Sequence, residues 1–528
     1  MSFYYELDKK ERIKKSLEIV DIVNKAKNIY FIGICGIGLS ALAQLFSRIG
    51  KKVSGSDLHE NETLSILVKE GIKIYVGHNL ANIDSTIKLY GKIDLAIYSP
   101  AVNEENIEFS YFKKNNIPTF TYGMALSYFI NSFNSVSICG THGKSSTTAI
   151  LAEMLLNNKI HTSFLCGAIL NKFGTNAFFS DNSKYFIAES CEYKETFLNF
   201  FPNNVIIPSL EVDHLDYYKN EENYFNAFKT FIEQIKGGIL ILRIEKDLEK
   251  RLYLYAKRLK NIEKIITYSD YTAEIFDGFE NQIHFYYFYD EKNPFEVRFE
   301  KNLINGKKKN IKKYNKNNDK NKEKQDNHIK KEILLTKTFK IPIPSKEYAA
   351  NFTSVIAFLE ISGILNEINI NYTDKYSGIK RRFELIGIDK NNNHIISDYA
   401  HHPSEIKTLL KISRLKYPDN KIFLIFQAHQ HSRTKYLLDQ FLDFFKNVEN
   451  LIILPIYRQR DSEEDVKNMS SAFFYENVLK VNKNALYFED NKNLYSFLQN
   501  NKNCIYLFTG AGTIDIFAKE YHKLASDK

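Results

Sequence analysis

The sequence predicts an α/β protein of three domains with mostly parallel sheets. Apolar runs that fit buried strands alternate with segments of helical period along most of the chain. Two of these runs, at residues 28–32 and 135–139, lead straight into glycine-rich turns, and a further alternation begins near Tyr376. The length of 528 residues exceeds what one hydrophobic core usually organises, and at roughly 150 residues per domain it suggests about three domains.

The first segment is expected to form one βαβ unit. The strand at residues 28–32 is followed by three glycines and a helix, and a second short strand leads to Asp57. Asp57 lies 21 residues after Gly36, a spacing at which a carboxylate typically meets a ribose hydroxyl. Gly33, Gly36 and Gly38 do not form the dinucleotide fingerprint, so a nucleotide diphosphate, a nicotinamide cofactor and a plain tight turn all stay open.

The second segment opens with the most informative motif. Residues 140–148, GTHGKSSTT, stand between a predicted strand and a predicted helix, where backbone N–H groups and the helix N-terminus favour a bound phosphate. Lys144 would reach the terminal phosphates of a nucleoside triphosphate, and Ser145 would offer a hydroxyl to Mg²⁺. Ile138 stands where the usual P-loop has its first glycine, so this loop is a shortened form. An ordinary turn is the alternative for the Gly-Lys-Ser tripeptide alone.

Acidic side chains follow two further strands that are predicted in this segment. Glu189 and Glu192 come after one of them, and Asp213, His214 and Asp216 come after the other. Because the ends of parallel strands meet at one edge of a sheet, these groups are expected near the phosphate loop, where they would hold a metal ion. Taken singly, each cluster also fits a solvated loop.

Polar residues follow two strands of the third segment, at residues 398–405 and 426–434. Their histidines and Arg433 suit the binding of a carboxylate or a phosphate. Neither stretch has the H-x-x-x-H spacing on a helix, so a zinc site is not expected. Surface histidines without a role are the alternative for His401 and His402 taken alone.

The net charge of +9 is concentrated in one insert. Residues 301–332 contain 12 lysines and four acidic residues, a net charge of +8, which leaves +1 for the rest of the chain. The low hydrophobicity of this insert predicts a disordered loop or a strongly extended hairpin. Its single aromatic residue is Tyr314, so stacking on bases, and with it a nucleic-acid partner, is not expected.

The use of cysteine and the apolar pattern indicate the compartment. The five cysteines are an odd number, lie far apart and form no C-x-x-C pair, which argues for a reducing environment. The first residues lack the apolar stretch of a signal peptide, and no run of about 18 apolar residues occurs. We therefore expect a cytoplasmic protein with no membrane partner.

Four stretches of the sequence resemble motifs of the Mur ligase family. They are FIGICGIGLSA at residues 31–41, CGTHGKS at 139–145, GIKRRFE at 378–384 and DYAHHP at 398–403. Shorter matches support them: VSGSD at 53–57, GH at 77–78, GTNA at 174–177, FQ at 426–427 with His429 and Arg433, and GAG at 510–512. Together these motifs cover nearly the whole chain in the family's order.

The resemblance implies a domain organisation and a reaction. Residues 1–133 would form a Rossmann-like domain for a UDP-sugar, residues 134–375 a P-loop ATPase domain that includes the insert, and residues 376–528 a C-terminal Rossmann-like domain. The implied reaction joins the lactyl carboxylate of UDP-N-acetylmuramate to L-alanine through an acyl phosphate, with ATP cleaved to ADP and phosphate and Mg²⁺ as cofactor. This is a step of peptidoglycan precursor synthesis, and a monomer or weak homodimer is expected.

Two other interpretations stay open. One is a ligase that adds a murein tripeptide to the same sugar nucleotide, although the H-x-x-S-R-T pattern at residues 429–434 favours L-alanine. The other is a catalytically idle homologue that acts as a scaffold.

The resemblance also assigns site residues by their motif positions. ATP would be cradled by Gly140, Thr141, His142, Gly143, Lys144, Ser145 and Ser146. Ser145 would hold one Mg²⁺, and Glu192 and His214 would ligate the Mg²⁺ between substrate carboxylate and γ-phosphate. Arg382 would reach the γ-phosphate and Asp398 the ATP ribose. The amino acid and acyl phosphate would be surrounded by Tyr399, His401, His429 and Arg433. The UDP portion would be held by Gly36, Gly38, Asp57, His78, Ser99 and Ala101. Lys144, Glu192, His214 and Arg382 form the expected catalytic set.

Four departures from the family's motifs are visible. Cys191 stands where the A-D-E-S stretch has an acid, and residues 209–211 read SLE rather than NIE. Gln430 stands where an arginine is common. Residues 344–348 read PSKEY and lack the His and Asn of P-G-x-H-N, which puts a polar contact of the central domain, expected to ATP, in question.

Overall fold

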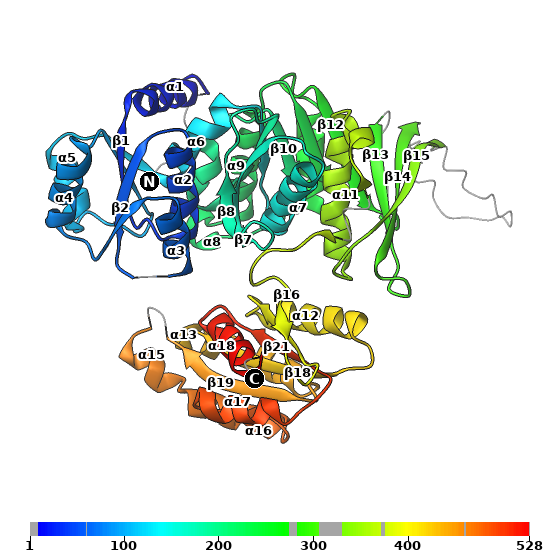
Figure 1. The fold of residues 1–528 in the computed structure, drawn as a ribbon. Coiled ribbons are helices and arrows are strands. Elements are labelled where there is room, and N and C mark those ends of the chain that lie inside the picture. The colour runs from blue at the N-terminus through cyan, green and yellow to red at the C-terminus, as the bar shows by residue number, and fades with distance from the viewer. Residues whose placement is uncertain are drawn as a thin grey trace. The chain divides into compact units, whose positions relative to one another are not determined.

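Three β-sheets organise the computed structural model, which describes residues 9–59, 61–273, 282–305, 330–370, 375–458 and 461–526. The chain divides into two compact units (Figure 1). The first comprises Met1–Pro342 and Lys346–Tyr376 and holds the N-terminal and central sheets, while the second comprises Ile343–Ser345 and Ser377–Lys528 and holds the third sheet. The expected α/β class with three sheets is confirmed, and the domain limits at 133/134 and 375/376 stay predictions.

The N-terminal sheet is parallel throughout, in the order β3-β2-β1-β4-β5. Its strands are β1 (Asn28–Ile32), β2 (Lys52–Asp57), β3 (Lys73–Val76), β4 (Leu95–Tyr98) and β5 (Thr119–Thr121). Its helices are α1 (Lys9–Lys25), α2 (Ile37–Arg48), α3 (Glu62–Lys69), α4 (Leu80–Tyr90), α5 (Ile107–Lys114) and α6 (Tyr122–Ser132). The central strand β1 is apolar and buried because helices cover both faces of a parallel sheet.

The central sheet has ten strands in the order β15-β14-β13-β12-β11-β10-β6-β9-β7-β8. Its strands are β6 (Ser135–Ile138), β7 (Thr162–Leu170), β8 (Thr175–Phe178), β9 (Tyr185–Glu189), β10 (Asn204–Ile207), β11 (Ile239–Arg243), β12 (Lys264–Asp270), β13 (Gln282–Tyr289), β14 (Glu296–Asn305) and β15 (Lys330–Lys340). Its helices are α7 (Lys144–Asn157), η2 (Tyr193–Asn199), α8 (Leu215–Tyr218), α9 (Glu221–Glu233), α10 (Asp247–Ala256), α11 (Lys346–Ile361) and η3 (Leu365–Glu367). The strands from β13 to β7 are parallel, and β8, β14 and β15 add antiparallel edges.

The Lys/Asn-rich insert joins two strands of this sheet. β14 and β15 pair antiparallel, with Asn305 opposite Lys330, so both ends of the insert lie in a hairpin. The expectation of a loop or an extended hairpin between them concerns residues 306–329, which lie outside the described residues.

The second unit has one six-stranded sheet in the order β16-β17-β21-β18-β19-β20, parallel except for β16. Its strands are β16 (Glu384–Ile388), β17 (His394–Asp398), β18 (Lys421–His429), β19 (Leu451–Tyr457), β20 (Leu486–Tyr487) and β21 (Cys504–Thr509). Its helices are α12 (Pro403–Lys416), α13 (His431–Tyr436), α14 (Leu438–Phe445), α15 (Glu463–Asn468), α16 (Ser471–Val481), α17 (Asn491–Gln499) and α18 (Ile514–Ser526). Across the described ranges, no helix is both long and apolar enough to span a membrane.

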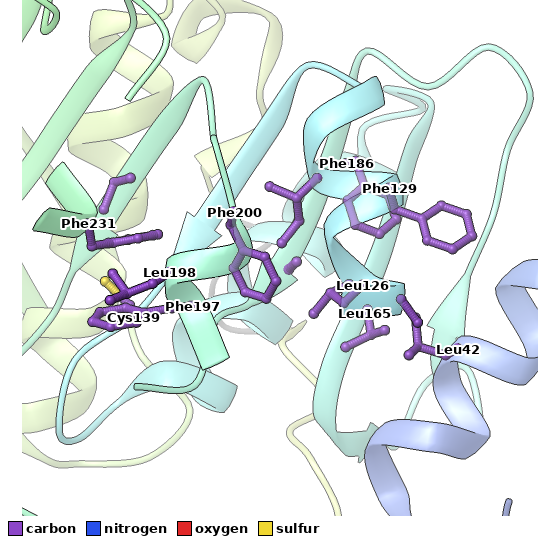
Figure 2. Packing of buried hydrophobic residues seen from close by; sticks show 14 of the residues in the cluster. Leu42, Leu126, Phe129, Cys139, Leu165, Phe186, Phe197, Leu198, Phe200 and Phe231 are labelled. Atoms are coloured by element: carbon purple, nitrogen blue, oxygen red, sulfur yellow. The ribbon is translucent and has the colours of Figure 1, made fainter. Parts of the chain in front are cut away.

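One continuous hydrophobic cluster contains buried residues of both the N-terminal and the central sheets of the first unit. Figure 2 shows its middle, where Phe129 of α6 lies beside Phe186 of β9. The two rings stack with centroids 5.5 Å apart, and Phe46 of α2 lies 5.0 Å from Phe129 on another side. Phe129 is fully buried, so its ring connects an N-terminal helix to a strand of the central sheet.

We predict that Phe129→Ala destabilises both sheets of the first unit together. Removing a fully buried phenylalanine ring costs about 3–5 kcal/mol. Calorimetry and urea titration should show one transition for the first unit, shifted as a whole. Phe473→Ala, which changes a 45% exposed ring on α16, is the control and should leave that transition in place. Separate transitions for the two sheets would contradict a shared core.

Candidate active site

The glycine loop after β6 has the backbone conformation that a phosphate loop needs. Gly143 adopts a left-handed φ of +82° and serves as the N-cap of α7. Gly140 has a φ of +123°, and a Cβ there would overlap the carbonyl oxygen of Ser209. A Cβ on Gly143 would lie 2.7 Å from Oδ1 of Asn351. Both glycines are therefore required by close contacts, and the α7 N-terminus stays available to an anion.

Lys144 is anchored inside this loop. Its Nζ donates to the carbonyl oxygens of Gly140, at 2.5 Å, and Thr141, at 3.2 Å, and lies 3.1 Å from Oε1 of Glu192. Burial alone would lower the pKa of Lys144, but the charge of Glu192 raises it above its ordinary value. The loop thus keeps a charged ammonium group beside a fully buried carboxylate.

Glu192 is the centre of the cluster. Nε2 of His214 lies 3.6 Å from the same Oε1 atom, and the hydrogen bond to Glu192 raises the pKa of His214 while burial opposes it. The second oxygen, Oε2, is buried and finds no hydrogen-bond partner within the described ranges. A buried carboxylate oxygen without a donor is the kind of atom that a cation would satisfy. The predicted set of Lys144, Glu192 and His214 is therefore brought together.

This cluster alone does not make a complete metal site. The described residues contain no group of three or more His, Cys, Asp or Glu side chains arranged to hold a metal ion. Mg²⁺ usually keeps several waters and takes substrate phosphate oxygens as ligands, so a site with two protein ligands and a serine hydroxyl fits its chemistry. Ser145 stands in the first turn of α7, where it would supply that hydroxyl.

The other residues of the phosphate loop have different surroundings. The Thr141 hydroxyl donates to the carbonyl oxygen of Glu211 at 2.7 Å and accepts from the Glu211 N–H at 2.8 Å, so it ties the loop to the segment after β10. His142 is exposed, and Ser146 lies in the first turn of α7. Asp216 accepts a hydrogen bond from the Tyr193 hydroxyl at 3.2 Å and does not join the Glu192 cluster through any contact in the described residues.

Glu347, one of the departures from the family's motifs, forms an ion pair with a buried arginine, while its own side chain is largely exposed. Its Oε2 lies 2.6 Å from Nη1 of Arg243, whose side chain is 7% exposed. Nη2 of Arg243 also bonds Glu245 at 2.9 Å and the Tyr287 hydroxyl at 3.0 Å. Glu347 thus helps to neutralise the buried guanidinium at the end of β11.

The glycine turn of the N-terminal sheet is held by Asp57. Its Oδ2 accepts the Cys35 N–H at 2.8 Å, so the carboxylate fixes the turn in addition to any role toward a ribose. Gly36 is the N-cap of α2, and a Cβ on Gly38 would lie 2.8 Å from the ring of Tyr122. Gly38 is therefore explained by close packing against an aromatic ring of α6.

Ser99 lies on the other side of this turn. A Cβ on Gly33, which has a φ of +83°, would lie 2.9 Å from the Cβ of Ser99. The Ser99 hydroxyl accepts the Ala101 N–H at 3.3 Å, so the segment after β4 closes over the turn. The predicted residues thus belong to the carboxyl ends of three neighbouring strands, β1, β2 and β4, which meet at one edge of the sheet: Gly36, Gly38, Asp57, Ser99 and Ala101.

His78 is held by a carboxylate that the sequence analysis missed. Its Nδ1 lies 3.2 Å from Oε2 of Glu108 and 2.9 Å from the Ser56 hydroxyl. Glu108 is fully buried and also accepts hydrogen bonds from Asn82 Nδ2 at 2.8 Å and from the Asn79 N–H at 3.0 Å. Burial alone would raise the pKa of Glu108, but these hydrogen bonds, that of His78 first, hold it below the ordinary value.

The sites of the second unit gather at the ends of β17 and β18. Both oxygens of Asp398 accept backbone N–H groups, from Phe383 at 2.7 Å and Ala400 at 2.8 Å. The bond from Phe383 ties the carboxylate to the loop that carries Arg382. Burial raises the pKa of Asp398, and the charge of Arg382 opposes this. The guanidinium carbon of Arg382 lies 5.7 Å from the centre of the Tyr399 ring.

His401, His429 and Arg433 lie near one another in the same unit. Burial lowers the pKa of His401, the charge of Glu405 opposes this, and the charges of Arg433 and His429 add to the lowering. The His429 ring stacks on Tyr457 with centroids 5.7 Å apart. Arg433 belongs to α13, a short helix that is followed after Leu437 by α14.

Comparison with known proteins identifies the family. Three family models match in order: Mur ligase family, catalytic domain at residues 28–134, Mur ligase middle domain at 138–297, and Mur ligase, glutamate ligase domain at 381–512. UDP-N-acetylmuramate–L-alanine ligase from Acetivibrio thermocellus is 32% identical over 514 residues, which covers 95% of this chain and 96% of that protein.

Two solved structures share the fold. UDP-N-acetylmuramate-alanine ligase from Thermotoga maritima aligns with a TM-score of 0.69 and 23% identity, covering 94% of this chain and 98% of its own. A murein peptide ligase from Psychrobacter arcticus aligns with a TM-score of 0.60 and 18% identity, covering 95% and 99%. The chain belongs to the Mur ligase family, and the expected class of ATP-dependent Mur ligase in peptidoglycan synthesis is confirmed.

We predict that Gly143→Ala weakens ATP binding far more than it weakens the fold. The new side chain would meet Asn351 and would also be strained at a φ of +82°, which costs about 1–2 kcal/mol. Gly237→Ala is the matched control, because Gly237 has a φ of +70° and no atom within 4 Å of a Cβ. Calorimetric titration should show at least about tenfold weaker ATP binding for the first variant only. Equal losses in both variants would contradict the close-contact explanation.

We predict that Glu108→Gln lowers stability in a pH-dependent way. The folded-state pKa of Glu108 lies below its ordinary value, so its stabilisation is complete above the unfolded pKa of about 4.3 and is lost as the pH falls through the folded value. Urea titrations should therefore give a deficit of about 1–3 kcal/mol at pH 7 that shrinks below about pH 4. Glu449→Gln, at an 82% exposed side chain, is the control. A deficit that is constant with pH would contradict the assignment.

Proposed function

We propose that this chain is a ligase that joins L-alanine to the lactyl carboxylate of UDP-N-acetylmuramate at the expense of ATP. The observation that supports it most is the Lys144–Glu192–His214 cluster beside a phosphate loop. A relative from Acetivibrio thermocellus, similar over nearly the whole chain, is named as a ligase of this kind.

ATP would bind with its phosphates at the N-terminus of α7. Gly140 and Gly143 bring the backbone close, and the Nζ of Lys144 would exchange its two loop carbonyl partners for β- and γ-phosphate oxygens. Mg²⁺ would be held by Ser145, Glu192 and His214, and when bound it neutralises charge on the phosphates. Oε2 of Glu192, without a donor in the described residues, is the atom that fits this role.

The UDP-sugar would occupy the carboxyl ends of β1, β2 and β4. Gly36, the N-cap of α2, leaves the helix N-terminus open to the pyrophosphate. Gly38 lets the first turn of α2 pack closely on α6, and Asp57 and His78 would flank the ligand. This directs the lactyl carboxylate toward the phosphate loop, where it attacks the γ-phosphate and becomes an acyl phosphate while ADP leaves. The amine of L-alanine then displaces phosphate through a tetrahedral intermediate.

The second unit would supply cationic groups to the developing negative charge. Arg382 is the group we assign to the γ-phosphate, and His401, His429 and Arg433 are assigned to the amino acid and acyl phosphate. Asp398 keeps the Arg382 loop in shape through its two backbone contacts, beside its proposed role at the ribose.

The test is phosphate release with purified full-length protein. We expect release only when ATP, UDP-N-acetylmuramate and L-alanine are all present, and Lys144→Ala should reduce kcat by about 100- to 1,000-fold. Lys184→Ala, at an exposed lysine just before β9, is the control and should be unchanged. Release with a murein tripeptide but not with L-alanine would replace the proposal by the tripeptide ligase, and no release with either would favour an idle homologue.

A further inference from the structure

The GTNA stretch at residues 174–177 contacts the helix that follows the first glycine turn. Asn176 of β8 is fully buried, and its Nδ2 donates to the Ile37 carbonyl oxygen at 2.5 Å in the first turn of α2. Its Oδ1 accepts from Nε2 of Gln44 at 2.9 Å. The Thr175 hydroxyl donates to Oε1 of the same Gln44 at 2.6 Å. Both ends of the Gln44 amide are therefore occupied by the β8 segment.

The same hairpin contacts the phosphate-loop side of the first unit. In β7, the strand that pairs with β8, the Gly167 N–H donates to Oε2 of Glu189 at 2.8 Å. The neighbouring Sγ of Cys166 lies 3.5 Å from the carbonyl oxygen of Ser145, in the first turn of α7. The β7–β8 hairpin thus touches the first turn of α2 and the first turn of α7.

We infer that Asn176, with Thr175 and Gln44, is a positioning contact that sets the distance between the UDP-sugar subsite and the ATP subsite. The inference rests on the proposed function. A carboxylate bound on one subsite must reach a γ-phosphate bound on the other, and a misplacement of about 1 Å can cost roughly 100-fold in rate.

Two buried amides suit this task because their contacts are directional. Each donor of the Asn176–Gln44 pair faces an acceptor, so sliding the hairpin along α2 would leave buried polar atoms unpaired. An apolar contact at this place would tolerate such a slip. Asn176 touches no atom that we assign to substrate, so its role is to position and not to react.

Asn176→Ala should therefore lower kcat more than it changes substrate binding. We expect kcat for phosphate release to fall about 10- to 100-fold, with KM for UDP-N-acetylmuramate and for ATP within about threefold. Gln234→Ala is the matched control. Gln234 is equally buried and donates to the carbonyl oxygens of Leu198 and Phe200 at 3.1 and 2.6 Å, but it links no two subsites. A fall in kcat no larger than that of the control would overturn the inference.

Gln44→Ala provides a second variant and a coupling test. If the two amides act as one contact, the double variant with Asn176→Ala should have nearly the kcat of either single variant. Independent, multiplicative losses would contradict a shared contact.

Hydrogen–deuterium exchange tests the contact without any turnover. In Asn176→Ala, the amides of α2 and of β7–β8 should exchange faster together, while Gln234→Ala should leave both protected. Faster exchange in the hairpin alone would refute the contact as a coupling element. Wild-type protein that turns over neither amino substrate would refute the proposed function, and the exchange result would still decide whether the hairpin fixes α2.

Discussion

Close backbone approach at the ends of the central strands is the constraint on which both proposed subsites depend. At Gly140 the phosphate loop lies so close to the Ser209 carbonyl that a Cβ would overlap it, and the Thr141 N–H uses the same carbonyl as its acceptor at 3.0 Å. Gly33 packs in a similar way on Ser99. Because the strand ends are drawn together, side chains that follow β10, such as His214, can reach the carboxylate that follows β9.

Two fully buried carboxylates of the first unit differ in how completely the folded chain pairs them. Glu108 has hydrogen-bond donors on both oxygens, from residues of β1, β2, α4 and the segment before α4, so folding alone satisfies it. Glu192 has Lys144 and His214 on one oxygen, and its other oxygen has no donor in the described residues. A buried charge that is incompletely paired destabilises the fold unless a ligand completes it, which is why we propose the second carboxylate and not the first for the reaction centre.

Features with a local signal could be predicted from the sequence, and features that depend on distant partners could not. The βαβ unit and the phosphate loop follow from short apolar runs, glycines and helical period, and the structure places them at those residues. Strands β13 to β15, which extend one edge of the central sheet, follow no glycine turn or phosphate motif, and an extended hairpin was only one of two expectations for the region of β14 and β15. Nothing in the sequence marks Glu108 as a binding partner, because His78, which it contacts, is 30 residues away. Asn176 does lie in a motif, but the side chain that it binds, Gln44, is 132 residues away.

The departure at residues 344–348 has a physical explanation within the chain. Arg243 is buried at the end of β11, and a buried guanidinium requires anionic partners, which Glu245 and Glu347 supply. A histidine and an asparagine at 347 and 348 would leave part of that charge unpaired. One turn further along α11, Asn351 still packs against Gly143, so the helix keeps its contact with the phosphate loop. The change therefore alters how α11 is anchored and leaves the Lys144–Glu192–His214 cluster intact, which removes the main reason to regard the chain as idle.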